Sequence, residues 1–184
     1  MKHLFSGVDV SKLAMAIKRQ PELWNKHKQR LELYENTGPH NGLSDIWVRY
    51  NDFDNFKGDM AEFNSEHDSV WYPAYDMLPQ VRDIVFPLMN AVEGERLGGV
   101  LITKIPPGKT CKPHVDGGWH AEYYDKYAVQ IESSEGQAFH FHGESFVSMP
   151  GDVYWFDNSK THWVTNESNQ DRVTMIVCIK SRGA

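Results

Sequence analysis

The chain has 184 residues, of which 40% are hydrophobic and 24% are charged, and its formal net charge is −6. This composition is typical of a globular protein with a buried core, and the length favours one domain. The apolar runs are too short for a membrane helix, and an acidic chain without a lysine and arginine block argues against a broad nucleic-acid-binding face.

The elements expected before residue 70 are helices and one strand. Spaced apolar residues over 7–32 predict helix, with Ser11 as a helix cap and Pro21 in the first turn of a second helix. Residues 45–50 (DIWVRY) are β-branched and aromatic and predict a strand. The polar residues 51–69 have little pattern and predict a loop over a pocket.

The second half of the chain has the pattern of a β-protein. Residues 79–92 still have helical spacing, which Pro87 interrupts, but many short apolar segments separated by turn residues follow. Such segments favour a sandwich or barrel over a parallel sheet. The predicted strands cover residues 100–105, 111–114, 124–132, 138–142, 144–149, 153–156, 162–166 and 172–180.

We therefore predict a mainly β protein with N-terminal helices, an α+β chain with a jelly-roll-like β half. A single domain is expected, in which residues 1–94 pack on a β core formed by residues 95–184. Cys111 and Cys178 form no evident disulfide framework, and the charged N-terminal segment lacks the apolar core of a signal peptide. We expect a cytoplasmic protein.

A candidate metal site lies in the stretch PPGKTCKPHVDGG, where His114 and Asp116 are two residues apart. Residues with this spacing point to the same face of a strand and can reach one cation. His162, which begins a strand after a polar turn, is the best candidate for a third ligand. Two histidines and a carboxylate on one side of an ion suit iron(II) and leave its other positions open. The alternative for His162 is a core histidine with a satisfied hydrogen bond.

Arg172 begins the last apolar strand, RVTMIVCI, ten residues after His162. Both faces of this strand have a buried pattern, so a guanidinium there needs an anionic partner. A bidentate grip on the carboxylate of a ligand is one solution. A structural ion pair with Asp157, Glu167 or Asp171 is the other.

Three stretches carry a resemblance to a known family: IPPGKTCKPHVD (105–116), FDNSKTHWV (156–164) and DRVTMIV (171–177). They resemble the iron(II)- and 2-oxoglutarate-dependent oxygenases, and within these the aspartyl/asparaginyl β-hydroxylase-like group, which includes short phage and bacterial members. The resemblance covers roughly residues 95–180. It implies a double-stranded β-helix, the cupin-like jelly roll, with extra helices outside, and a phage gene is one source to consider.

The resemblance also implies the iron ligands His114, Asp116 and His162, with Arg172 binding the distal carboxylate of 2-oxoglutarate. The animal aspartyl hydroxylases have a glycine in place of the acidic ligand. This chain instead resembles the three-ligand members, such as the free-proline hydroxylases, which argues against an aspartyl substrate.

Further residues are candidates for the cosubstrate and substrate. The resemblance implies a hydroxyl near the distal carboxylate, for which Thr103 is the candidate, and contacts to the keto-acid end from the strand that holds Lys126 and Tyr127. The candidates for substrate contact lie on the early strand and in the loop after the metal motif; they are Arg49, Trp47, Trp119 and His120.

The function implied is a dioxygenase that uses iron(II), 2-oxoglutarate and dioxygen to hydroxylate a C–H bond, releasing succinate and carbon dioxide. Its substrate would be a small amino-acid-like molecule or a peptide side chain. Two alternatives stay open: a cupin-like metalloenzyme independent of 2-oxoglutarate, and a non-catalytic jelly-roll binding module. In the cupin-like case His140 and His142, which share one strand face, would bind metal with a glutamate such as Glu144.

Overall fold

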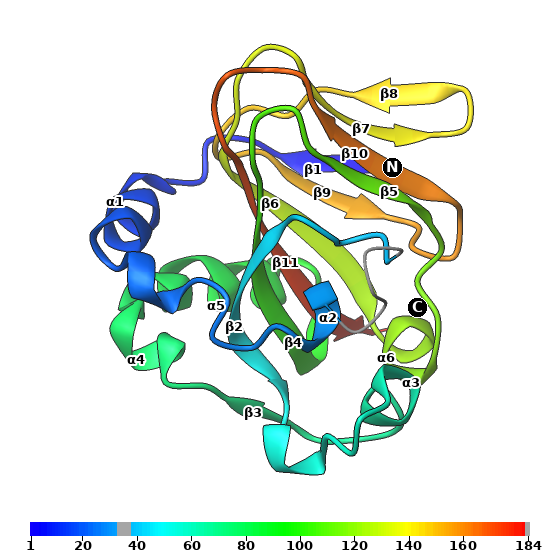
Figure 1. The fold of residues 1–184 in the computed structure, drawn as a ribbon. Helices are drawn as coiled ribbons and strands as arrows, with labels where there is room; N and C mark the ends of the chain where they lie inside the picture. Colours follow the sequence, from blue (N-terminus) through cyan, green and yellow to red (C-terminus); the bar gives the residue numbers. More distant parts are fainter. Residues whose placement is uncertain (33–37, 183–184) are drawn as a thin grey trace.

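The computed structural model describes residues 1–32 and 38–182 and arranges their strands in two antiparallel sheets (Figure 1). The larger sheet has the order β1-β9-β6-β11-β4-β2-β3 and the smaller one β5-β10-β7-β8. The large-sheet strands are β1 (Lys2–Phe5), β2 (Ser44–Asn51), β3 (Ser69–Trp71), β4 (Gly94–Ile105), β6 (Asp125–Glu132), β9 (Val153–Phe156) and β11 (Arg172–Ser181). The small-sheet strands are β5 (Thr110–His114), β7 (Gln137–Phe141), β8 (Glu144–Phe146) and β10 (His162–Asn166).

Side-chain alternation along the strands divides the large sheet between two apolar cores. On β11, Val173, Met175 and Val177 pack in the core that the helices cover, whereas Ile176 on the opposite face packs in the core between the two sheets. Two sheets that share an apolar interior form a cupin-like jelly-roll sandwich. The predicted fold class is therefore confirmed.

Helices cover the outer face of the large sheet and one end of the sandwich. The longer ones, α1 (Ser11–Arg19) and α5 (Arg82–Ala91), place Leu13, Ile84 and Leu88 in the outer core. The shorter ones are α2 (Gln29–Glu32), α3 (Met60–Phe63), α4 (Ala74–Met77) and α6 (Trp119–Tyr123). In Figure 1, α3 and α6 lie side by side, on the opposite side of the molecule from α1 and α5.

The structure corrects several details of the predicted elements. The strand expected from Val100 begins at Gly94, and the strand expected over 144–149 ends at Phe146. Ser11 was expected to cap α1, but its backbone N–H and hydroxyl both donate to the Asp9 carboxylate. The strands β1 and β3 and the helix α6 were not predicted, because each is too short to show a clear hydrophobic period.

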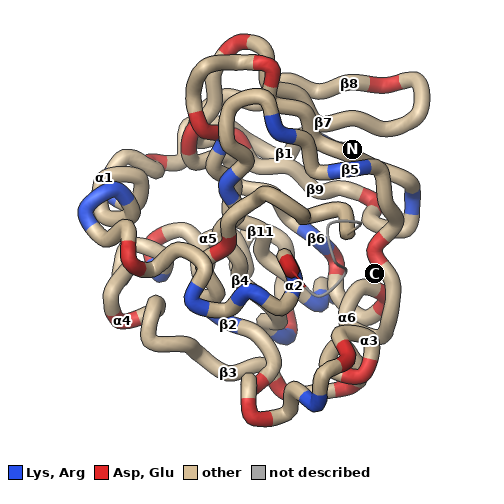
Figure 2. The backbone as a smooth tube through the Cα atoms, in the orientation of Figure 1, with Lys and Arg blue, Asp and Glu red and all other residues tan. Residues whose placement is uncertain are grey.

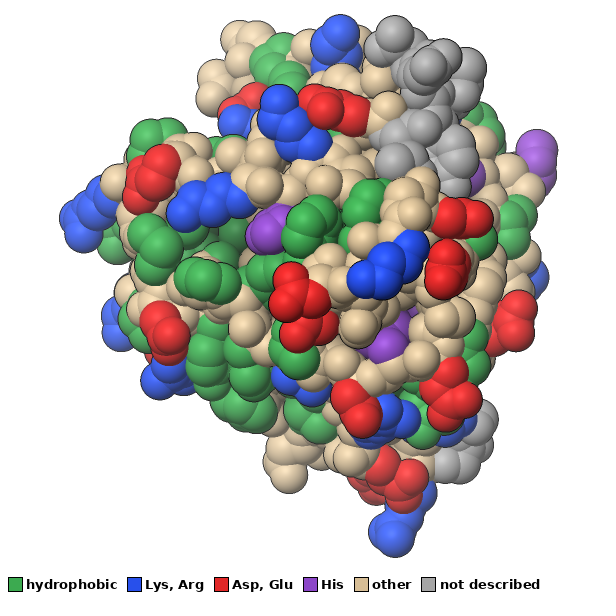
Figure 3. Space-filling view, turned by 60° about the horizontal axis from the view of Figure 1, so that its bottom comes forward, with side chains coloured by type: hydrophobic (Ala, Val, Ile, Leu, Met, Phe, Trp, Pro, Cys, Tyr) green, Lys and Arg blue, Asp and Glu red, His purple; other side chains and the backbone are tan. Residues whose placement is uncertain are grey.

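Acidic and basic residues are interspersed along the described part of the chain. Lysine and arginine alternate with aspartate and glutamate along the backbone (Figure 2), and the face seen in Figure 3 mixes acidic, basic and hydrophobic side chains. No helix among the described residues is long and apolar enough to cross a membrane.

Two glycines in β4 allow the segment around α6 to lie directly on the sheet. A Cβ atom at Gly98 would lie 2.8 Å from Cζ of Tyr124, and one at Gly99 would lie 3.2 Å from Nε2 of His120. Any other residue at these positions would have to displace a buried ring. The two glycines therefore allow α6 and Tyr124 to pack closely against β4. Helix α6 directly follows the loop that carries Asp116.

We predict that Gly98→Ala lowers the free energy of unfolding by about 1–3 kcal/mol, because the added methyl group overpacks against the Tyr124 ring. Chemical denaturation of the two proteins measures the difference. Gly117→Ala is the matched control, since nothing lies within 4 Å of a Cβ there. Equal losses in the two variants would contradict the close packing of this segment on β4.

Candidate metal centre

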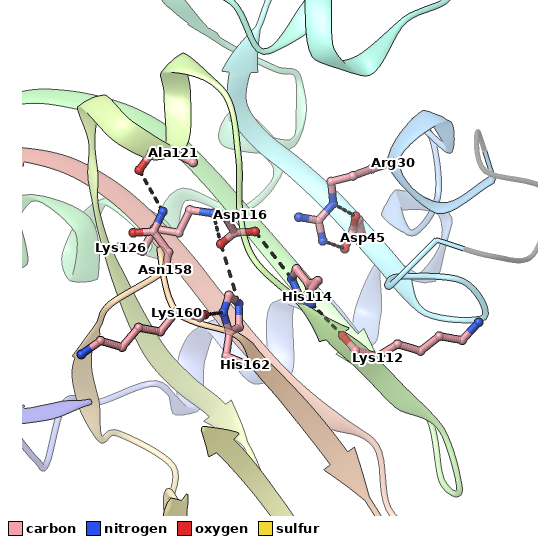
Figure 4. Close-up of polar contacts among 10 residues, drawn as sticks. All are labelled: Arg30, Asp45, Lys112, His114, Asp116, Ala121, Lys126, Asn158, Lys160 and His162. Carbon is pink, nitrogen blue, oxygen red and sulfur yellow. Dashed lines mark hydrogen bonds and ion pairs between the residues drawn. The ribbon is translucent and has the colours of Figure 1, made fainter. Parts of the chain in front are cut away.

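The pairing of β5 with β10 brings two histidines together. His114 at the end of β5 lies opposite His162 at the start of β10, and their ring centroids are 4.4 Å apart. The Asp116 carboxylate lies between them, with Oδ1 3.5 Å from Nε2 of His114 and Oδ2 3.7 Å from Nε2 of His162 (Figure 4). The structure thus brings the three predicted ligands within reach of one ion.

Both imidazoles are oriented by backbone carbonyl groups. Nδ1 of His114 donates to the carbonyl oxygen of Lys112 at 2.7 Å, and Nδ1 of His162 donates to that of Lys160 at 2.9 Å. A carbonyl oxygen only accepts, so each Nδ1 carries hydrogen, and Nε2 is the nitrogen of each ring that can bind a metal once it is deprotonated. Hydrogen bonds of this kind fix the tautomer of metal-binding histidines. The donor set therefore fits a divalent cation such as iron(II).

A lysine ammonium group balances the carboxylate. Nζ of Lys126 on β6 lies 2.6 Å from Oδ2 of Asp116. Burial acts to raise the pKa of Asp116, but Lys126 and His114 together hold it well below its usual value. Burial lowers the pKa of His162. Burial also acts to lower the pKa of His114, but its contacts with Asp116 and Cys111 outweigh burial and raise this pKa to about 10.

Asn158 links the two segments that carry the ligands. Its carbonyl oxygen accepts a hydrogen bond from the backbone N–H of Asp116 at 3.1 Å, and its side-chain Nδ2 donates to the carbonyl oxygen of Ala121 at 2.8 Å (Figure 4). The residue precedes β10, which begins with His162. Asp116 lies beyond the end of β5 and has no strand pairing. These two hydrogen bonds therefore position its loop instead.

A narrow cavity of about 80 Å³ extends from the three ligands into the sandwich. Its wall includes Thr103, Arg172, Thr174 and the apolar side chains of Ile105 and Phe139. Thr103 and Lys126, both sequence candidates for cosubstrate contact, therefore border the same cavity as the three ligands.

Arg172 is the buried cation of this cavity. Its Nη1 donates to the Thr174 hydroxyl at 2.6 Å and its Nη2 to the Ser148 hydroxyl at 3.4 Å. Both hydroxyls also approach Oε1 of Gln130, at 3.3 Å and 2.8 Å. Burial lowers the pKa of Arg172 to about 10. Among the described residues no carboxylate lies within ion-pair distance of the guanidinium, so its partners here are hydroxyl groups.

The acidic residues that the sequence offered as structural partners of Arg172 bind elsewhere or have no such contact. Asp171 lies 3.8 Å from Lys104, and Asp157 lies 3.3 Å from Lys160. The other arginine at the cavity, Arg30, is neutralised: its Nε and Nη2 lie 2.8 Å and 3.4 Å from the two oxygens of the buried Asp45 (Figure 4).

The wider space outside the ligands has a volume of about 420 Å³. It borders His114 and Asp116, and its wall includes Arg30, Asn64 and His120, although both ring nitrogens of His120 are buried. Of the four candidate substrate residues, His120 reaches this space. The other three are engaged elsewhere: Trp47 is 3% exposed in an aromatic core, Arg49 donates to the carbonyl oxygen of Leu97, and Trp119 stacks on Tyr123.

Neither of two further predicted pairs, Lys126 with Tyr127 and His140 with His142, acts together at a candidate ligand site. Tyr127 lies next to Lys126 on β6 and therefore faces the opposite side of the sheet, where its hydroxyl contacts Ser181 at 2.8 Å. His140, the first histidine of the cupin-like alternative, uses its two ring nitrogens in contacts with Ser145 and Thr165. His142 is exposed, and neither joins a potential ligand cluster among the described residues.

Sequence reasoning missed Arg30, Asp45, His40 and Asn158. The arginine and aspartate lie fifteen residues apart in the chain, so no local pattern connects them. Asn158 could have been found, because it follows a predicted strand in the stretch FDNSKTH that leads to His162. Polar residues in such a turn commonly hold neighbouring backbone groups.

Comparison with known proteins identifies the family. Residues 22–181 match the family described as Aspartyl/Asparaginyl beta-hydroxylase, and the chain belongs to that family. The resemblance seen in the three stretches is thus confirmed, and the protein is an oxidoreductase of the hydroxylase class. A comparison with curated proteins found no match.

One of the solved structures similar to this chain shares its fold at low sequence identity. An oxidoreductase of the 2OG-Fe(II) oxygenase family from Burkholderia pseudomallei superposes with a TM-score of 0.57 at 10% identity, over 80% of this chain and 72% of that chain. A predicted oxalate decarboxylase from Thermotoga maritima gives a TM-score of 0.37 at 20% identity, over 51% of this chain and 72% of that chain. A cupin domain from Bordetella pertussis gives a TM-score of 0.37 at 20% identity, over 47% of this chain and 85% of that chain.

His120 makes stability depend on pH. It is 5% exposed, neither ring nitrogen has a hydrogen-bond partner among the described residues, and burial lowers its pKa from 6.5 to about 3. Between these two values the unfolded chain binds the proton and the folded chain does not, so stability falls as the pH falls through this window.

Wild type is expected to lose unfolding free energy when the pH falls from about 7 to about 5. We predict that this loss is smaller by about 2 kcal/mol in His120→Phe, because phenylalanine cannot bind the proton. Denaturant titrations at the two pH values measure this difference. His142→Phe, at an exposed histidine, is the control and should keep the wild-type pH dependence. The same pH dependence in His120→Phe and wild type would contradict this prediction.

Proposed function

We propose that the protein is an iron(II)- and 2-oxoglutarate-dependent hydroxylase. In the overall reaction 2-oxoglutarate, dioxygen and a substrate C–H bond yield succinate, carbon dioxide and the hydroxylated substrate. Membership of the hydroxylase family supports the class of reaction. The paired histidines and the carboxylate support the metal, because they combine a facial donor set with orienting hydrogen bonds.

The observation that carries the dependence on 2-oxoglutarate is the position of Arg172. A buried guanidinium bonded only to hydroxyl groups is stabilised when an anion enters its cavity. The same cavity borders His114, Asp116 and His162. A dicarboxylate can therefore place one end near the three ligands and the other on Arg172, with Thr174 and Ser148 holding the guanidinium in position.

Each part of the site has a separate task in this proposal. His114, Asp116 and His162 would hold iron(II), which supplies the activation of dioxygen for oxidative decarboxylation of 2-oxoglutarate and C–H hydroxylation. Lys126 balances the negative charge of Asp116 and is available to a carboxylate at the near end of the cavity. Ile105, Phe139 and other apolar side chains exclude water from the space around the cosubstrate.

The wider space outside the ligands is the proposed substrate site. Its polar lining from Arg30 and Asn64 suits a small amino-acid-like molecule or the side chain of a flexible peptide. Asp45 already neutralises Arg30, so this arginine would position the substrate by hydrogen bonding more than by net charge.

His162→Ala is expected to abolish succinate formation from 2-oxoglutarate, because two ligands remain and the metal is lost. Metal content and succinate production are measured on the folded variant. His140→Ala serves as the control and should keep both, although in the cupin-like alternative it would lose its metal. Near-normal turnover by His162→Ala would exclude the proposed centre.

Arg172→Gln is expected to weaken 2-oxoglutarate binding by at least about 30-fold, because truncating one partner of a buried charge pair costs roughly 2–5 kcal/mol. Anaerobic titration of the metal-loaded protein with 2-oxoglutarate gives the dissociation constant. Arg182→Gln is the control: it removes an exposed arginine directly after β11 and should leave the dissociation constant for 2-oxoglutarate unchanged. Equal constants for the two variants would contradict the role of Arg172.

A further inference from the structure

A second group of potential metal ligands overlaps the first. His40, Cys111 and His114 each offer one ligand atom, and these atoms all lie within 4.8 Å of one another. His40 lies in the segment before β2, and its ring centroid is 5.0 Å from that of His114 at an interplanar angle of 71°. Cys111 is buried and is not part of a disulfide.

A bulge in β5 explains why Cys111 and His114 share a face. Residues three apart on a regular strand point to opposite sides. Here His114 pairs with His162 and Cys111 pairs with Val164, so three steps on β5 correspond to two steps on β10. The bulge therefore contains Lys112 and Pro113, which together lie opposite one residue of β10. A proline is readily accommodated at such a bulge.

Both groups need the same atom of His114. Its Nδ1 is bound to the carbonyl oxygen of Lys112, so Nε2, once deprotonated, is the nitrogen that can bind a metal. That nitrogen lies 3.5 Å from Asp116, a ligand of the first group. An ion bound by His40 and Cys111 therefore takes Nε2 of His114 from the first group, and the two groups exclude one another.

The two groups differ in the kind of ion they favour. The first combines two imidazoles with a carboxylate, a set that suits iron(II). The second replaces the carboxylate by a thiol that is deprotonated on binding, and two imidazoles with a thiolate suit zinc in tetrahedral coordination with one open position. Sulfur is the softer donor and shifts the preference toward thiophilic ions.

We propose that His40, Cys111 and His114 form a zinc site that competes with the iron(II) site for His114. Zinc bound there leaves Asp116 and His162 as the other residues of the first group, too few to retain iron(II). Cys111 also borders the cavity of Arg172, so the bound ion lies next to that cavity. The inhibitory consequence rests on the proposed function, whereas the zinc site itself does not.

Cobalt(II) is the probe for the zinc site, because a thiolate ligand gives cobalt a charge-transfer absorption in the near ultraviolet that nitrogen and oxygen ligands do not. The titration is made on the metal-free His162→Ala variant, which lacks one ligand of the first group and keeps all three of the second. The band is expected at one equivalent of cobalt. In His162→Ala/Cys111→Ser it should disappear, and cobalt affinity should fall at least about tenfold.

Cobalt binding to His162→Ala without a thiolate band would overturn the zinc site. Asp116→Ala provides a second background in case the first variant does not fold, and the same band is expected there. A band found in the wild type and lost in both backgrounds would show that sulfur only flanks the first group, which also overturns the proposal.

Competition is measured with manganese(II), whose bound and free forms differ in their electron paramagnetic resonance. Zinc should displace manganese from wild type at a concentration at least about tenfold lower than from Cys111→Ser. Equal concentrations would overturn the competition. Neither measurement involves 2-oxoglutarate, so a failed zinc site leaves the proposed hydroxylase intact, and an absence of 2-oxoglutarate turnover leaves the cobalt result intact.

Discussion

The antiparallel pairing of β5 with β10 is the constraint on which the metal centre depends. Its register sets His114 opposite His162. A shift of one residue would turn one of the two side chains to the other face of the small sheet. Asp116 lies beyond the strand and is held by the Asn158 carbonyl, so the third ligand depends on the loop before β10 as well. The bulge in β5 uses the same pairing to add Cys111 to the face of His114.

The buried charges next to this pairing are compensated unequally. Asp45 neutralises Arg30, and Lys126 neutralises Asp116, at distances of 2.8 Å and 2.6 Å. Arg172 contacts the hydroxyl groups of Thr174 and Ser148, and no carboxylate of the described residues compensates it. A buried charge without a counter-ion is costly to the folded protein. This uncompensated charge is the basis of the proposed carboxylate site at Arg172.

The rim of the site is shaped by close packing more than by charge. Gly98 and Gly99 let α6 approach the sheet, which buries His120 against β4 with both ring nitrogens unpartnered among the described residues. On β2, the register shifts between Trp47 and Arg49. Trp47 consequently packs in an aromatic core, and the Arg49 guanidinium lies 4.9 Å from the centroid of the Trp71 ring. Trp47 and Arg49 therefore line neither the narrow cavity nor the wider space next to the candidate ligands.

The sequence by itself determined the parts that depend on local pattern: the strands of the jelly roll, the spacing of His114 and Asp116, and a buried face for Arg172. Both Lys126 and Tyr127 were predicted to contact the cosubstrate, without use of the fact that neighbours on a strand point to opposite sides. Only the tertiary structure decided which partners the buried groups take. Arg30 binds Asp45, Asn158 binds the backbone of Ala121, and His120 packs against Gly99. These residues are far apart in the chain, and contacts of this kind arise from tertiary packing, which a local sequence pattern does not predict.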